Sequence, residues 1–358
     1  PYKVEGVNNP NFFGMVANID HNLGLLRDHL KDLNLDENTI LVFMTDNGTS
    51  AGCKFPGLDT EPILGFNAGM RGKKSSIYEG GHRVPFFLHW PVGGYSKGRD
   101  IETLAAHIDV LPTLADLCKL PKPDKRYDVD GLSLIPLLTN KVNSWERNHL
   151  FLQYHGGAHH KFALGPLTNS VVMTERWRLV NTDKAEELYD IVNDPAQRNN
   201  IASQRPGFVK DLRTAYQAFW KRVSPGLKPV AIDLGDPSEN PAVLCSQDWR
   251  PETGNPPWNF RSIKEIPKVT HPWLVNVLEA GEYRFTLRQW PKEADKPIIG
   301  VKARIKIAGV EKEAVIREGS KEINFTLTLP SGITELWTYI YNQQGKVGGA
   351  YFTEVEKL

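Results

Sequence analysis

A run of apolar residues, Ile40–Met44, ends directly in the polar segment Thr45-Asp46-Asn47-Gly48. Apolar side chains at every position, instead of every second one, are typical of a strand covered on both faces, as in a parallel sheet. Val84–Trp90 has the same character, and helices are predicted on either side of this pair of strands, over 11–33 and 101–120. This order of elements predicts an α/β fold, in which ligands gather at the carboxyl ends of strands, where Asp46 and Asn47 lie.

The first predicted helix carries apolar side chains at alternating steps of three and four, so we expect it to bury one stripe of its surface. The stripe consists of Phe12, Val16, Ile19, Leu23, Leu26, Leu30 and Leu33.

A second motif follows the first strand, with Gly72-Lys73-Lys74 placed shortly before Glu79-Gly80-Gly81. The carboxylate of Asp46 and the amide oxygen of Asn47 suit a hard cation such as calcium. The ammonium group of a lysine suits a bound oxyanion. The alternatives are a plain turn after a strand for Asp46-Asn47-Gly48 and a solvated surface pair for the lysines. Together the two motifs predict a site for a sulfate or phosphate ester.

In their order, these motifs resemble the second half of the type I, formylglycine-dependent sulfatases (arylsulfatases), which belong to the alkaline phosphatase superfamily. Arg83-Val84-Pro85 continues the likeness, and three later landmarks follow in the family's order at His107–Leu114, Asp130–Leu134 and Glu187–Pro195. The resemblance covers residues 10–205 and implies part of a sulfatase-type α/β sandwich. It also implies the hydrolysis of sulfate esters, either aryl sulfates or sulfated carbohydrates.

The resemblance implies a role for each residue of the two motifs. Asp46 and Asn47 are expected to be ligands of one Ca2+ ion, whose site is completed by residues upstream of this chain. Lys74 matches the catalytic lysine that contacts the sulfate group. Lys73 is the residue directly before Lys74 and is a substrate-binding candidate. His155, in a loop that contains further histidines and glycines, is another.

The expected nucleophile is absent from the sequence. In the family it is a Cys or Ser, matured to formylglycine, in a C/S-x-P/A-x-R motif, and none of Cys53, Cys118 and Cys245 lies in such a motif. The chain also begins at Pro1 without an initiator methionine. We therefore expect a C-terminal portion that is inactive alone and whose partner is the missing N-terminal portion of the same protein. The resemblance implies a periplasmic or secreted location.

Two alternatives to a sulfatase remain open at this point. One is a phosphodiesterase or phosphonate hydrolase of the same superfamily. The other is a non-catalytic glycan-binding protein, because tryptophans such as Trp249, Trp258, Trp273 and Trp290 could stack on sugar rings if they are exposed. Packing inside the protein is the alternative for these tryptophans.

Three domains are predicted from the changes in pattern along the chain. Residues 1–140 form the C-terminal part of the catalytic α/β domain, 141–235 a smaller antiparallel sheet with a covering helix, and 236–358 a β-rich domain whose alternating strands suggest a sandwich. The formal net charge of +1 offers no general electrostatic attraction to nucleic acid or membranes. No apolar run approaches the ~20 residues of a membrane span.

Overall fold

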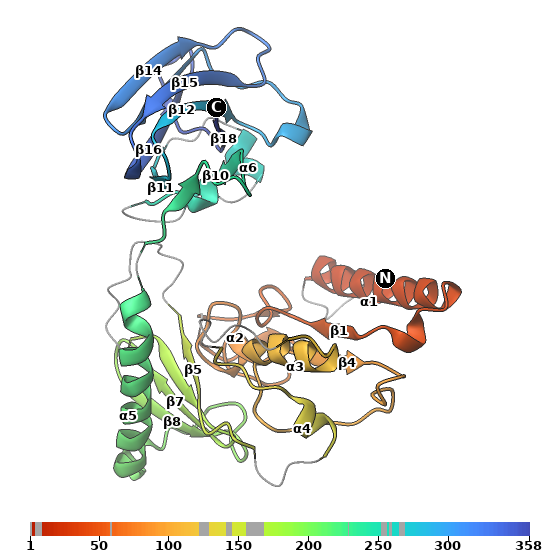
Figure 1. The fold of residues 1–358 in the computed structure, drawn as a ribbon. Helices are drawn as coiled ribbons and strands as arrows, with labels where there is room; N and C mark the ends of the chain where they lie inside the picture. The colour runs from red at the N-terminus through yellow and green to blue at the C-terminus, as the bar shows by residue number, and fades with distance from the viewer. Residues whose placement is uncertain are drawn as a thin grey trace. The chain divides into compact units, whose positions relative to one another are not determined.

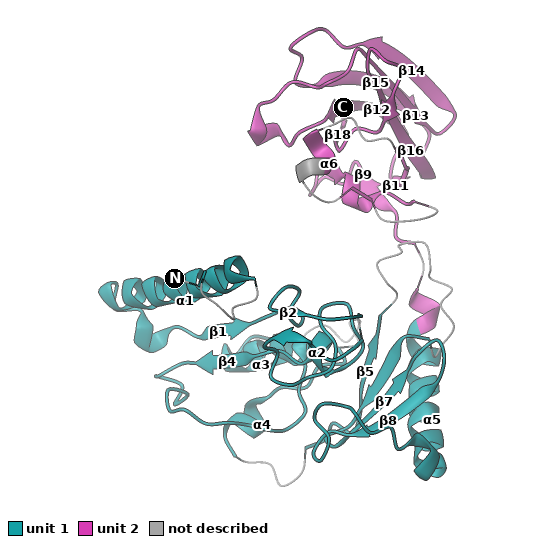
Figure 2. Cartoon of the chain, turned by 180° about the vertical axis from the view of Figure 1, so that it is seen from behind, with its two compact units in different colours: residues 1–156, 164–223 teal, residues 157–163, 224–358 magenta. Residues whose placement is uncertain are grey.

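The computed structural model divides the chain into two compact units, the first ending at Val223 and the second beginning at Ser224 (Figure 2). The antiparallel sheet predicted for the middle of the chain lies in the first unit, and the division into 1–140, 141–235 and 236–358 stays a prediction. The structure describes residues 2–3, 9–57, 59–121, 129–140, 145–154, 168–227, 229–251, 256–257, 260–264 and 269–358.

The first unit begins with helix α1 (Pro10–Asp32), followed by strand β1 (Leu41–Met44) (Figure 1). Asn9 starts the helix, because its side chain accepts a hydrogen bond from the Phe12 amide. β1 pairs with β4 (Phe86–His89), and the pairing is antiparallel, with Met44 opposite Phe86. The expected parallel arrangement is therefore wrong for this pair. An apolar run indicates a strand but carries no direction, and no long crossover helix separates these two strands.

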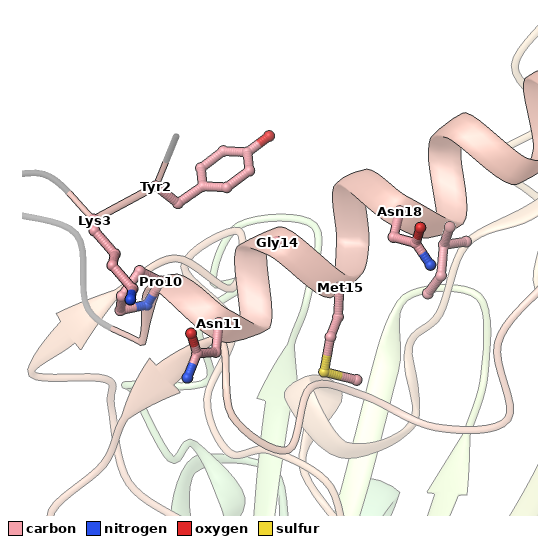
Figure 3. A pocket seen from close by; sticks show the side chains of 8 residues that line it. Tyr2, Lys3, Pro10, Asn11, Gly14, Met15 and Asn18 are labelled. Atoms are coloured by element: carbon pink, nitrogen blue, oxygen red, sulfur yellow. The ribbon is translucent and has the colours of Figure 1, made fainter.

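The exposed surface of α1 is a second departure from expectation. None of its residues is buried, and the side chains of Met15 and Ile19 are 65% and 52% exposed. Phe87 of β4 is 64% exposed. Figure 3 shows an open pocket along α1, lined in part by Met15, Asn18 and Tyr2. The prediction that α1 buries an apolar stripe is wrong for the part of the chain that the structure describes. The described residues provide no layer of side chains that covers this face of α1.

The shorter elements of the first unit lie in the loop between β1 and β4 and in the segment after β4. Asp109 directly precedes the first residue of helix α3. Its buried carboxylate accepts hydrogen bonds from the Ala106 and Leu132 amides and pairs with Arg147, which holds the start of the helix at this position. The helix predicted over 101–120 is therefore shorter than expected. The elements are β2 (Cys53–Lys54), β3 (Leu64–Gly65), α2 (Glu79–His82), α3 (Val110–Leu117) and α4 (Ile135–Leu138).

An antiparallel sheet completes the first unit and confirms the elements predicted for this stretch. Its strands follow one another in the order β5 (Leu150–Gln153), β6 (Ser170–Met173), β7 (Trp177–Asn181) and β8 (Glu186–Asp190). Helix α5 (Pro206–Val223) covers one face, where Leu212 packs with Leu179 and Leu188. On the other face, Ile77 and Tyr78 pack with Val171, Val180 and Tyr189. The lysine motif is therefore attached to this sheet through its own apolar residues.

A buried ion pair strengthens this attachment. Glu79 Oε1 accepts a hydrogen bond from Arg178 Nε of β7 at 2.7 Å, and the two side chains are 1% and 6% exposed. The Glu79 amide donates to the side chain of Gln197, which is also buried. Arg83 approaches the same carboxylate at 3.7 Å, but Arg178 is the closer partner.

His82 also faces Glu79, at 3.9 Å between Nε2 and Oε1. It is the last residue of helix α2, and its side chain is only 12% exposed. Burial lowers the pKa of His82 from its ordinary value of 6.5, and the opposing charge of Glu79 does not fully offset this effect.

The second unit is a β-sandwich, as expected. One sheet has the order β10-β18-β12-β15 and the other β14-β13-β16-β11-β9, with β17 pairing to β16. Side chains of both sheets meet in one core, for example Phe285 and Val355 from the first and Ile305 and Ile340 from the second. The strands are β9 (Ile232–Leu234), β10 (Ala242–Cys245), β11 (Trp273–Val277), β12 (Gly281–Arg288), β13 (Lys302–Ile307), β14 (Val310–Val315), β15 (Ile323–Leu329), β16 (Gly332–Tyr341), β17 (Val347–Gly348) and β18 (Phe352–Lys357).

The tryptophans considered as sugar platforms are internal where the structure describes them. Trp249 and Trp273 are fully buried and Trp290 is 8% exposed, so packing accounts for these three. Trp258 lies outside the described residues. No helix in the described part of the chain is long and apolar enough to cross a membrane.

The substitution Arg178→Ala should destabilise the first unit by about 3–5 kcal/mol, because it leaves the buried Glu79 carboxylate without its closest counter-charge. Urea unfolding followed by far-UV circular dichroism measures the change. Arg176→Ala is the matched control: Arg176 pairs with Asp190, but its side chain is 51% exposed, so the unfolding midpoint should hardly move. Equal effects of the two substitutions would contradict the importance given to burial of the pair.

The lowered pKa of His82 makes stability depend on pH. Below its ordinary pKa of 6.5 the unfolded chain takes up a proton at this position that the folded chain resists, so the free energy of unfolding should fall as the pH falls from 6.5. His82→Gln should weaken this dependence. Thermal unfolding of both proteins between pH 7.5 and 5 tests this, because contributions from other histidines cancel in the difference. Identical slopes would show that His82 is not held neutral.

Candidate functional site

The segment that follows β1 is joined to the lysine motif by two backbone hydrogen bonds. The Gly48 amide donates to the Gly81 carbonyl at 3.0 Å, and the Lys74 amide donates to the Thr49 carbonyl at 2.9 Å. These bonds bring the segment that carries Asp46 and Asn47 to the loop that carries Lys74, at the carboxyl end of β1. The two motifs recognised in the sequence therefore form one structural unit.

Glycine is required where these segments meet. A Cβ atom on Gly48 would lie 1.8 Å from the Gly80 carbonyl oxygen, and one on Gly81 would lie 2.1 Å from the Ser76 carbonyl oxygen. Any side chain at either position would push the segments apart. Glu79, Gly80 and Gly81 form the buried start of helix α2, and the missing side chains of the two glycines allow this close approach.

Asp46 is exposed and Asn47 partly buried. Asp46 accepts hydrogen bonds from the amide and from the side chain of Asn47, the latter at 2.6 Å between Nδ2 and Oδ2. Because the Asn47 side chain turns its nitrogen toward Asp46, its amide oxygen remains available to a cation. The donor types therefore fit calcium, although two oxygens are far fewer than the six to eight it takes. No group of three or more His, Cys, Asp and Glu residues among the described residues could hold a metal ion.

The two lysines have different surroundings. Lys73 Nζ lies 5.3 Å from the centre of the Phe55 ring, within the range of a cation–π contact. Lys74 is exposed, and its ammonium group has no hydrogen-bond or ion-pair partner within the described ranges. Lys74 is therefore the lysine that is free to meet an anion, in keeping with its predicted role, which stays a prediction.

A polar cluster that we did not predict connects the lysine loop to β8. Tyr78 and Tyr189 both donate to Glu187 Oε2, at 2.5 and 2.7 Å. Arg71 donates to the Tyr189 hydroxyl and lies over the Tyr78 ring, 3.8 Å from its centre. Burial, together with the Glu187 carboxylate, raises the pKa of both tyrosines, which keeps their hydroxyls protonated as donors. The one sequence signal was the alternation that places Glu187 and Tyr189 on one face of β8.

Two further residues, His107 and Cys53, have surroundings that fit a structural role. His107 Nε2 is 2.8 Å from the Thr45 carbonyl oxygen, which can only accept, so this nitrogen carries the proton and fixes the start of the segment that contains Asp46. Cys53 is buried, and burial raises the pKa of its thiol, which disfavours the nucleophilic thiolate. His155 lies outside the described residues.

Two family models match this chain. The sulfatase model matches residues 8–120, and a model described as N-sulphoglucosamine sulphohydrolase, C-terminal, matches residues 71–216. Together they include both joined segments and the antiparallel sheet.

Curated relatives agree with these matches. The chain is 28% identical to an N-acetylgalactosamine-6-O-sulfatase of Bacteroides thetaiotaomicron over 217 residues, which is 55% of this chain and 39% of that protein. It is 33% identical to the human steryl-sulfatase over 228 residues, covering 57% of this chain and 38% of that protein. The chain thus spans about two fifths of the length of these relatives.

A comparison of structures supports the fold alone. The crystal structure of Ps i-CgsB superposes with a TM-score of 0.50 at 22% identity, over 61% of this chain and 44% of that one. The mixed α/β architecture of the first unit is consistent with this neighbour. The family assignment rests on the two family models and the curated relatives: residues 8–216 of this chain belong to the sulfatase family.

Proposed function

We propose that the protein to which this chain belongs hydrolyses sulfate esters, and that Asp46, Asn47 and Lys74 contact the sulfate group or its counter-ion. The observation that carries the proposal is the pair of hydrogen bonds that joins the segment of Asp46 to the loop of Lys74. In a member of the sulfatase family, a cation held by Asp46 and Asn47 and the ammonium group of Lys74, which has no partner among the described residues, would neutralise a bound anion from two sides.

In the proposed reaction R–O–SO3⁻ and water give R–OH, sulfate and a proton, and the bond that breaks joins sulfur to the ester oxygen. Negative charge grows on the leaving oxygen as this bond breaks. The Lys74 ammonium group lowers the energy of that charge when it is aimed at it. Asp46 and Asn47 would hold calcium, which supplies a positive charge that polarises the sulfate oxygens.

We propose that the nucleophile and the remaining calcium ligands come from polypeptide outside residues 1–358, which packs on α1, β1 and β4. Exposed apolar side chains support a covering layer there, because an exposed face of this kind indicates a contact surface. Buried Cys53 is poorly suited to attack sulfur. The share of the relatives that this chain spans leaves room for such a layer.

The proposed substrate is a sulfated carbohydrate or an aryl sulfate. The name of the Bacteroides thetaiotaomicron relative supports a sulfated sugar, and that of the human steryl-sulfatase supports a sulfate ester of a sterol. Membership of the sulfatase family favours sulfate esters over the phosphodiesters and phosphonates considered as the alternative. A periplasmic or secreted location remains part of the proposal.

The substitution Lys74→Ala should lower kcat/KM for a sulfate ester by about 10²–10³-fold, the loss typical of removing one donor to a developing oxyanion. Steady-state hydrolysis of para-nitrophenyl sulfate by the longer protein measures it. Lys73→Ala is the matched control and should cost much less, because Lys73 contacts Phe55. A larger loss for Lys73→Ala would show that Lys73, and not Lys74, contacts the developing charge.

The 358-residue chain alone should show no turnover of the same substrate, because the proposed nucleophile lies outside it. Turnover by this chain would disprove a nucleophile supplied from outside residues 1–358.

The substitution Asp46→Ala should weaken calcium binding to the longer protein by at least about tenfold, because it removes the only carboxylate of the proposed pair. Isothermal titration with calcium, after treatment with a chelator, gives the affinity without relying on activity. Asp183→Ala, in the exposed turn between β7 and β8, is the control and should leave the affinity unchanged. Equal affinities for the Asp46 variant and the unmodified protein would exclude Asp46 as a ligand.

A further inference from the structure

The outer surface of one sheet of the second unit carries a row of aromatic side chains. Leu336, Thr338 and Ile340 of β16 are buried in the core, so the residues between and after them point outward. These outward residues are Trp337, Tyr339 and Tyr341, and all three remain partly exposed.

A row of basic side chains runs beside the aromatic row. β13 pairs with β16 so that Lys306 lies opposite Trp337, Arg304 opposite Tyr339 and Lys302 opposite Tyr341. We call these six residues the aromatic face. Opposite neighbours on one surface of a sheet lie close enough for their side chains to interact.

The outer surface of the other sheet has a different character. Arg284 and Arg288 of β12 lie there, and they pair with Glu356, Glu354 and Glu322. Its outward positions on β12 and β15 are polar or charged, with Thr326 and Thr328 among them. Aromatic side chains in a row are therefore a property of one outer surface, and the sandwich fold does not require them.

Contacts on the aromatic face hold the rings in place. The rings of Trp337 and Tyr339 lie 6.3 Å apart with only 8° between their planes. Arg304 is 4.1 Å from the centre of the Tyr339 ring, and Lys302 is 4.6 Å from that of Tyr341. Trp337 Nε1 donates to Glu335. Side chains already ordered in this way lose little entropy when a ligand binds.

The charges on the face leave one cation available. Arg304 pairs with Glu311 and Lys302 with Glu313 of β14. Lys306 is exposed and forms no ion pair with any residue that the structure describes. A free ammonium group therefore stands opposite Trp337, at the end of the aromatic row.

We propose that the aromatic face binds a sulfated oligosaccharide, with sugar rings lying over Trp337 and Tyr339 and a sulfate group at Lys306. The C–H face of a sugar ring packs well on an aromatic ring, and an unpaired ammonium group complements a sulfate. The choice of a sulfated sugar over a neutral one rests on the proposed function. The aromatic face belongs to the second unit and Lys74 to the first, so the proposed binding surface contains none of the residues around Lys74.

Isothermal titration of the whole 358-residue chain with oligosaccharides of chondroitin 6-sulfate and of κ-carrageenan, each beside its desulfated form, tests this proposal. We expect binding of at least one sulfated probe, and Trp337→Ala should weaken it about tenfold, as loss of an aromatic anchor commonly does. Tyr339→Phe keeps the ring and should preserve binding. Lys306→Gln should remove the preference for the sulfated form over the desulfated one.

Arg284→Gln, on the outer surface of the other sheet, is the matched control and should leave binding unchanged. Absence of binding to both sulfated probes, or equal binding by Trp337→Ala, overturns the proposal. So does a sedimentation result in which Trp337→Ala converts a dimer to a monomer, because the face would then join two copies of the chain. Glycan binding and hydrolysis are separate measurements. If Lys74→Ala abolishes hydrolysis by the longer protein but leaves glycan binding intact, the proposed function and the proposed binding surface are each supported by their own measurement.

Discussion

The buried pair of Glu79 and Arg178 is the interaction on which the candidate site depends. It joins the lysine loop to β7, where apolar contacts of Ile77 and Tyr78 and the cluster around Glu187 act beside it. A buried charge pair is stable only when both partners are present and well bonded. Glu79 therefore fixes helix α2, and α2 in turn presents the Gly81 carbonyl to the segment of Asp46.

Local pattern predicted much of this architecture, and the limits of the prediction have physical causes. The antiparallel sheet and its covering helix were predicted because short strand-like stretches, such as Trp177–Asn181, precede a long helical one. The direction of β4 relative to β1 could not be predicted, since an apolar run looks the same in either direction. Arg178 was missed because its partner Glu79 lies far away in the sequence, and a lone arginine in a strand carries no sign of burial.

Family resemblance and geometry contribute different parts of the functional account. The order of the motifs identifies the family, and the comparisons confirm it for residues 8–216. Geometry adds that the segment of Asp46 and the loop of Lys74 meet through glycines that no side chain could replace. In the second unit, the tryptophans singled out from the sequence are internal where described, whereas the alternation along β16 places other aromatic residues at the surface.

Amide hydrogen exchange in the unmodified chain and in Arg178→Ala tests most directly whether the buried pair positions the site. Exchange reports the local free energy of opening at each amide. The account predicts that the amides of Gly48, Lys74 and Gly81 lose protection together in the variant, while those of the second unit stay unchanged. Protection that persists at these three amides while other parts of the first unit loosen would contradict it.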